Sequence, residues 1–225
     1  MESWLSQAKT LPSLQVEIGF LIQDSFYYGP DRFSDIADRE RLADTLVPPR
    51  IQREFPSLVT SSEAVGHERE LAAYYRRIVG LAHHHQRPFN SIRHYFWLRL
   101  LLWNAEHEVS ISFPWYDSFS DIDRFLTALV GIDTGLVDHD MDQGWELQTY
   151  ASDGVLYLSE RDPDSGETHV EISVPRAGLV AQVEELRERT AAVVTQISSL
   201  LGADVWTAYV GMEPGFSAEP PWSKP

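Results

Sequence analysis

Cysteine is absent from the 225 residues of this sequence. Its absence excludes disulfide bonds and thiolate chemistry, and it suits a reducing cytoplasm, where we expect the protein to lie. The first residues, MESWLSQAKTLPS, have no basic segment followed by an apolar one. No apolar run approaches the roughly 18 residues that a membrane-spanning helix needs. We therefore expect neither secretion through this segment nor a membrane span.

Basic residues are scarce as well. The chain has 18 Lys and Arg against 34 Asp and Glu, which gives a formal net charge of −16. Such a charge repels nucleic acid and anionic membranes, and it steers a basic protein inward at low salt. Acidity can also serve solubility alone, so that alternative stays open. We expect a basic protein partner, no nucleic acid and no membrane.

Motifs for catalysis and cofactor binding are also missing. The sequence contains no G-x-S-x-G nucleophile turn, no G-x-x-x-x-G-K-[ST] phosphate loop and no G-x-G-x-x-G dinucleotide loop. Carboxylates are so numerous that no pair stands out as a general acid and base. The sequence therefore predicts no catalytic residue and no cofactor, and motifs lend no support to enzymatic activity.

Two polar clusters resemble metal sites. Asp138, Asp140 and Asp142 have the spacing that opens a calcium loop. The glycine and glutamate that such a loop requires later are replaced by Gln143 and Thr149, so we expect an acidic surface loop without metal. The consecutive histidines of 83–85 would point about 100° apart on a helix and could not easily converge on one ion, whereas an H-x-x-x-H spacing could. We predict a solvated helix end there.

Residues 92–115 form the most apolar stretch of the chain. Apolar side chains fill both alternating positions over 92–103, which predicts a strand covered on both faces, with a helix as the alternative. After a polar break at 104–106, residues 109–113 alternate as in a strand with one buried face. Trp97 and Trp103 are expected in the core.

The remaining elements follow from periodicity, caps and turn residues. We predict a strand with one covered face over 14–28 and a three-strand meander over 145–174. We predict helices over 31–47, 60–86, 117–132 and 179–201, of which the second begins with a capping box formed by Thr60 and Glu63. The predicted fold class is α+β: a mixed, mostly antiparallel sheet made from the early strand, the central hairpin and the C-terminal meander, with helices packed chiefly on one face. We expect one domain over 1–210 and a Pro/Gly-rich tail over 211–225.

Acidic and aromatic side chains recur together between 115 and 146. Aromatic rings supply the buried anchors of protein interfaces, and carboxylates supply steering and rim contacts for a basic partner. The candidate partner-binding residues are Trp115, Tyr116, Asp133, Asp138, Asp140, Asp142, Trp145 and Glu146.

The second half of the chain resembles a known class of proteins. The segment GWELQTYASDGVLYLSERDPDSGETHVEISVP, followed by a long amphipathic helix, is similar to the small acidic α+β immunity proteins that bacteria make against polymorphic toxins. The resemblance implies a bacterial cytoplasmic protein that binds and occludes a toxin domain without doing chemistry. It carries no functional residue over to this sequence.

A different function remains as an alternative. His67, His83 or His94 and nearby carboxylates could line a pocket between the sheet and the 60–86 helix. The chain would then be a small-molecule-binding domain or a hydrolytic enzyme.

Overall fold

The computed structural model describes residues 3–30, 40–111, 113–208, 210 and 214–216. The chain divides into two compact units that interleave along the sequence. The first unit comprises 1–18, 100–116 and 120–188, and the second comprises 19–99, 117–119 and 189–225. The sequence analysis predicted one domain over 1–210 and did not foresee this division into two units.

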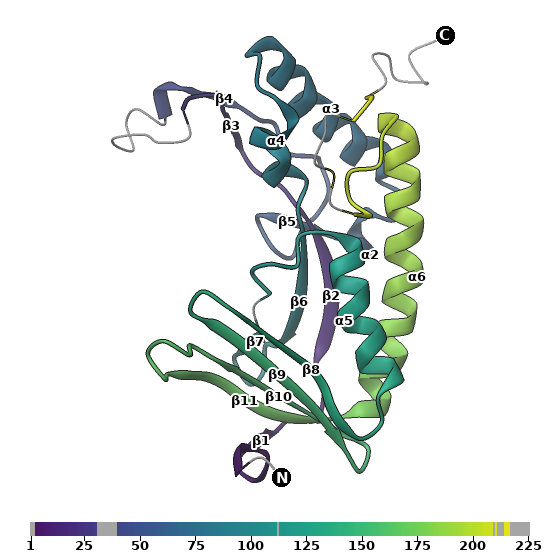
Figure 1. Cartoon of the computed structure of the whole chain (residues 1–225). Helices are drawn as coiled ribbons and strands as arrows, with labels where there is room; N and C mark the ends of the chain where they lie inside the picture. The colour runs from purple at the N-terminus through teal and green to yellow at the C-terminus, as the bar shows by residue number, and fades with distance from the viewer. Residues whose placement is uncertain (1–2, 31–39, 112, 209, 211–213, 217–225) are drawn as a thin grey trace. The chain divides into compact units, whose positions relative to one another are not determined.

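A five-stranded sheet dominates the first unit (Figure 1). Its strands are β1 (Lys9–Thr10), β8 (Gly135–Asp142), β9 (Trp145–Ser152), β10 (Val155–Arg161) and β11 (Thr168–Pro175), in the order β1-β11-β10-β9-β8. Only β1 runs parallel to its neighbour. The predicted meander is confirmed as β9, β10 and β11, and Asp153-Gly154 forms one of its turns with both φ angles positive.

The sheet buries one of its two faces. On β9 the side chains of Trp145, Leu147, Thr149 and Ala151 are buried, whereas alternate residues from Gln148 onward are half-exposed. Helices α5 (Phe119–Gly131) and α6 (Arg176–Leu201) confirm the predictions for 117–132 and 179–201. Figure 1 shows α5 beside the first half of α6, and an Arg187–Asp123 ion pair of 2.6 Å joins them.

Strand β8 corrects the sequence prediction for residues 138–142. We expected an acidic surface loop there, but these residues form the edge strand of the sheet and pair with β9. The turn between the two strands is Gln143-Gly144, with φ of 20° and 78°. The period-two signal is present in D-x-D-x-D, but it is carried by charge rather than by apolar residues, which is why a test of hydrophobic alternation missed it.

The second sheet contains β5 (Leu58–Thr60), β2 (Gln15–Leu21), β6 (Leu98–Asn104) and β7 (Val109–Ile111), in the order β5-β2-β6-β7. β2 was predicted to have one covered face, but residues 16–20 are all buried. The strand predicted over 14–28 also ends at Leu21, and β3 (Ser25–Tyr27) pairs instead with β4 (Ala43–Thr45).

The central apolar stretch is only partly a strand. Residues 92–97, predicted as the start of a strand, lie in the end of α4 (Phe89–Ile92), in a 3-10 helix, η2 (Arg93–Phe96), and in a linking residue. Because the helical turns bury Tyr95 and Phe96, their apolar character does not require a strand. β6 then alternates between buried and half-buried residues, and Trp103 is one of the half-buried ones. Trp97, directly before β6, is half-buried as well, so neither tryptophan lies in the core as predicted.

Two further helix predictions need correction. The capping box is confirmed, since Thr60 and Glu63 bond reciprocally, but the helix over 60–86 is divided into α2 (Ser61–Ala64) and α3 (Glu68–His84). Gly66, with φ of 82°, lies at the break. For the predicted helix over 31–47, residues 31–39 lie outside the described residues, and 43–45 form β4.

The core of the second unit is aromatic. Trp206 is fully buried, and its ring lies 5.0 Å from that of Tyr75 and 5.8 Å from that of Phe96. Phe216 stacks on Phe96 at 6.2 Å, so this part of the predicted tail contacts the core. Only 214–216 of the predicted tail are described.

The fold class is α+β, as predicted, with mixed and antiparallel sheets and helices in both units. The early strand β2 and the central hairpin β6-β7 lie in one sheet and the meander lies in another, so the prediction of a single sheet is wrong. The remaining element is a 3-10 helix, η1 (Ser3–Ser6). Over the part of the chain that the structure describes, none of the helices has the length and apolar character that crossing a membrane requires.

Candidate partner-binding site

Strand β8 carries three of the predicted site residues on one side. Because side chains alternate along a strand, Asp138, Asp140 and Asp142 share one face, and His139 and Met141 share the other. β8 contains no Lys, Arg or Pro. The strand is therefore acidic on one face and has no cation of its own to neutralise that face.

A buried phenol links two of these aspartates. The Tyr116 hydroxyl lies 3.1 Å from Asp140 Oδ2 and 3.4 Å from Asp138 Oδ2. One phenol carries one hydrogen, so it satisfies one carboxylate at a time. Burial, and then the charge of Asp140, raise the pKa of Asp138, and the charge of Arg124 on α5 opposes them in part. Burial and the same two carboxylates raise the pKa of Tyr116 far above its ordinary value, so Tyr116 stays protonated as the donor.

Tyr116 is fixed in turn by an aromatic cluster. Its ring centroid lies 5.3 Å from Phe113, 5.9 Å from Phe125 and 6.4 Å from Trp145. Trp145 is 7% exposed, and its indole donates to Glu160 over 3.1 Å. Tyr116 and Trp145 therefore pack in the core beneath the edge of the sheet, and their rings are not accessible to a partner.

Trp115 differs from the other two predicted aromatic residues. Its side chain is 46% exposed, directly before Tyr116 in the sequence. A half-exposed ring beside the residue that binds the aspartates has the character of an interface anchor.

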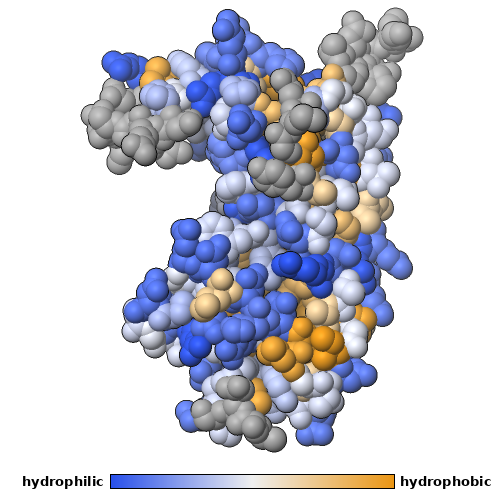
Figure 2. Space-filling model, in the orientation of Figure 1, coloured by the Kyte–Doolittle hydropathy of each residue, from blue (hydrophilic) through white to orange (hydrophobic). Residues whose placement is uncertain are grey.

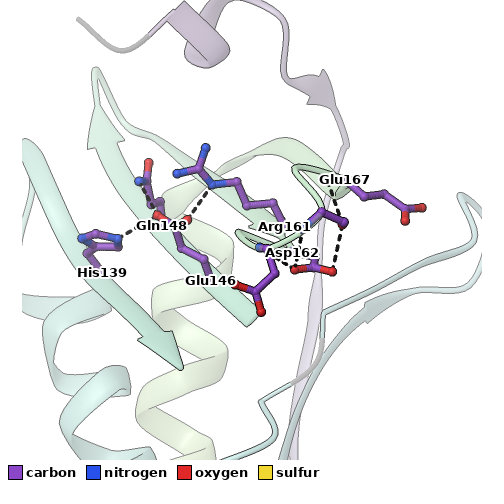
Figure 3. Close-up of polar contacts among 8 residues, drawn as sticks. His139, Glu146, Gln148, Arg161, Asp162 and Glu167 are labelled. Atoms are coloured by element: carbon purple, nitrogen blue, oxygen red, sulfur yellow. Dashed lines mark hydrogen bonds and ion pairs between the residues drawn. The ribbon is translucent and has the colours of Figure 1, made fainter. Parts of the chain in front are cut away.

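Glu146 belongs to a separate polar cluster on the opposite face of the sheet (Figure 3). Arg161 Nε donates to Glu146 Oε2 over 2.6 Å, and Gln148 Nε2 donates to Oε1 over 2.9 Å. His139 Nε2 lies 2.8 Å from the same Oε1. The hydrogen bond from Arg161, followed by those from His139 and Gln148, overcomes the effect of burial and lowers the pKa of Glu146 to about 2. The Glu146 carboxylate is 3% exposed and has no room for a further donor. Its bonds to His139 of β8 and Arg161 of β10 join both strands to β9.

Asp133 is placed differently again. It is 85% exposed and forms a 2.8 Å ion pair with Arg176 Nη1. Arg176 also donates to the carbonyl oxygens of Leu129 and Val130, at the end of α5. Asp133 thus helps to hold an arginine at a helix C-terminus, where a cation is favoured.

The structure brings together Tyr116, Asp138 and Asp140, with Asp142 two residues further along the same face. It places Asp133 and Glu146 in local ion pairs. Where Figure 1 draws β9 to β11, Figure 2 shows a mostly hydrophilic surface, and near the β8 label it shows a hydrophobic patch. Leu136 and Met141 of β8 are exposed.

The histidines of the alternative prediction do not converge within the second unit. His67 lies before α3, 3.4 Å from Glu70, and His94 packs on Tyr95 in η2. His83, near the end of α3, lines an open hollow of about 480 Å³ together with Ala82, Gln86, Arg87 and Pro88. Among the described residues, no group of three or more His, Cys, Asp and Glu side chains is arranged to hold a metal ion.

Sequence reasoning missed one histidine–carboxylate pair. His85 Nε2 lies 2.7 Å from Asp44 Oδ2, and its ring stacks on Tyr28 at 3.8 Å. The pair connects the end of α3 to β4. No sequence signal could have joined residues 41 positions apart on elements of different type.

Comparisons of this chain with protein-family models, with curated proteins and with solved structures found no match.

Proposed function

We propose that this chain is an acidic protein-binding domain, and that it acts as an immunity protein which binds and occludes a basic toxin domain in the bacterial cytoplasm. The observation that carries the proposal is the edge strand β8, with three aspartates on one face and neither lysine nor arginine in the strand. The resemblance of residues 144–201 to immunity proteins suggests that the partner is a toxin domain. The net charge of −16 attracts a basic protein over long distances.

Electrostatics supports a basic partner at β8. Two carboxylates compete for the Tyr116 hydroxyl, and their mutual repulsion contributes to the raised pKa of Asp138. A lysine or arginine placed between them would relieve this repulsion and supply the missing donors. The exposed Trp115, which directly precedes Tyr116 in the sequence, supplies apolar contact area.

The proposal is tested by affinity capture from a lysate of the producing organism. The tagged protein is compared with two variants that lose equal charge. In the β8-Asn variant, Asp138, Asp140 and Asp142 become Asn; in the surface-Gln variant, the exposed residues Glu106, Glu184 and Glu188 become Gln. Captured proteins are eluted at about 0.3 M salt, where surface charges are strongly screened, and identified by mass spectrometry.

We expect one basic protein that the wild type and the surface-Gln variant retain and the β8-Asn variant loses. The eluted protein should be toxic or enzymatically active, and adding back the wild-type chain should abolish that activity. Retention of no basic protein, or equal retention by the β8-Asn variant, would contradict the proposal.

A further inference from the structure

β8 has the longest free edge among the described strands. The strands at sheet ends are β1, β5, β7 and β8, with two, three, three and eight residues, and each strand of the β3-β4 pair has three residues. An edge strand presents a row of N–H and C=O groups that can pair with another chain. β8 therefore offers the largest backbone surface for such pairing.

The hairpin register identifies which backbone groups face that edge. A two-residue turn at Gln143-Gly144 makes Asp142 and Trp145 a hydrogen-bonded pair. Pairs then alternate along an antiparallel ladder, so His139 and Met141 lie at positions that are not bonded to β9. Their N–H and C=O groups point away from β9, toward the open edge.

Edge strands usually carry devices that prevent pairing, and β8 has few of them. Lysine, proline and bulges are the common protections. β8 has neither lysine nor proline, and its one register shift lies between Leu136 and Asp138, so residues 138–142 remain regular. Its only other protection is negative charge. That charge repels a second copy of this chain but attracts a basic strand.

We propose that β8 binds an extended basic segment of the partner as an added strand of the five-stranded sheet. This inference rests on the proposed function and specifies how the partner binds. The segment carries Lys or Arg at every second position, facing Asp138, Asp140 and Asp142. Its intervening residues face His139 and Met141, of which Met141 is 61% exposed and can cover an apolar side chain.

Backbone pairing and charge would have separate roles in this mode. Hydrogen bonds to His139 and Met141 give affinity that is independent of the partner's side chains, and the aspartates select a basic segment over a neutral or acidic one. The half-buried Asp138 and Asp140 both lie within reach of the Tyr116 hydroxyl, which donates to one of them and leaves the other to accept from the partner.

A peptide experiment separates the two contributions. The probe is a synthetic peptide of alternating lysine and threonine, as long as β8. Its matched control has the same sequence with the threonine nitrogens methylated, which keeps the charge but removes backbone donors. Amide hydrogen exchange of the full chain, followed by NMR, reports on the His139 and Met141 N–H groups directly.

We expect the unmodified peptide to slow exchange at His139 and Met141, and the methylated peptide not to. Equal binding of both peptides, or no protection with the unmodified one, overturns the inference. A peptide of alternating glutamate and threonine should have no effect; protection by that peptide would equally count against the charge selection.

Two variants of the chain provide a second readout. Met141→Pro removes an N–H group that is not used in the β9 ladder, so the sheet should tolerate it. Met141→Ala removes the same side chain and keeps the N–H. We expect Met141→Pro to bind the unmodified peptide about tenfold more weakly than Met141→Ala, with both variants folded. Equal affinity of the two variants would contradict the inference.

Failure of this inference and failure of the proposed function have different signatures. If the captured basic protein binds Met141→Pro as well as Met141→Ala but not the β8-Asn variant, the partner docks by charge alone and only the added strand is wrong. If no basic protein is captured, the proposed function fails. A dimer of this chain that Met141→Pro dissociates would assign the edge to a second copy and overturn the inference.

Discussion

At the scale of single residues, three carboxylates at the β8–β9 hairpin differ in how they are satisfied. Glu146 is saturated by three donors and nearly inaccessible, whereas Asp138 and Asp140 share one phenol. The first arrangement stabilises the folded sheet. The second leaves acceptor capacity at the edge, which suits binding. The sequence alone places all three in one acidic stretch and cannot distinguish them.

Glu146 should make stability depend on pH. Its pKa lies at about 2 in the folded chain, below the ordinary value of 4.5, so the ionised form stabilises the fold. This contribution is present above about pH 4.5 and is lost as the pH falls toward 2. Since the partner Arg161 is about half-exposed, we expect Glu146→Gln to lower the free energy of unfolding by about 1 to 2 kcal/mol at pH 7. Urea unfolding at pH 7 and near pH 3 measures the difference.

The matched control is Asp142→Asn, which removes an exposed carboxylate from the neighbouring strand. It should change the unfolding free energy by less than about 0.5 kcal/mol at either pH. A Glu146→Gln effect that stays the same size near pH 3 would show that the hydrogen-bonded charge is not its source.

At the scale of elements, local signals predicted some segments well and others poorly. The meander and α6 were correct because turn residues and helical periodicity act within short windows. The boundary at 97/98 was missed because apolar residues in a buried 3-10 turn resemble those in a buried strand. β8 was missed because its alternation is carried by aspartates: its inward face meets a tyrosine hydroxyl instead of an apolar core, so a search for apolar alternation does not find it.

Two leucines of β6 test which side chains of that strand face the core. Leu98 is fully buried, and Leu101, on the opposite face of the same strand, is half-buried. We expect Leu98→Asp to cost more than about 4 kcal/mol, because it buries an unpaired charge, and thus to lose soluble yield and cooperative melting. Leu101→Asp should fold, with a lower melting temperature. Equal behaviour of the two variants would contradict the assignment.

At the scale of the whole molecule, composition predicts a class of partner and does not predict where that partner binds. A net charge of −16 indicates repulsion of nucleic acid and attraction of basic proteins, but 34 acidic residues cannot show where a partner docks. The predicted site contained the edge strand, yet three of its members, Tyr116, Trp145 and Glu146, are buried. Burial depends on contacts between distant segments, and neither charge nor spacing in the sequence reports it.

The central claim is that a basic protein binds the acidic edge of β8. The most direct measurement is its association rate with the purified captured partner, taken by stopped flow from about 0.05 to 0.3 M salt, for the wild type, the β8-Asn variant and the surface-Gln variant. We predict that the association rate of the wild type falls roughly tenfold or more over this range, and that the rate of the surface-Gln variant falls in the same way. The β8-Asn variant should associate more slowly at low salt, and its rate should depend less on salt. A rate that is independent of salt, or a β8-Asn variant with the wild-type rate and slope, would contradict the claim.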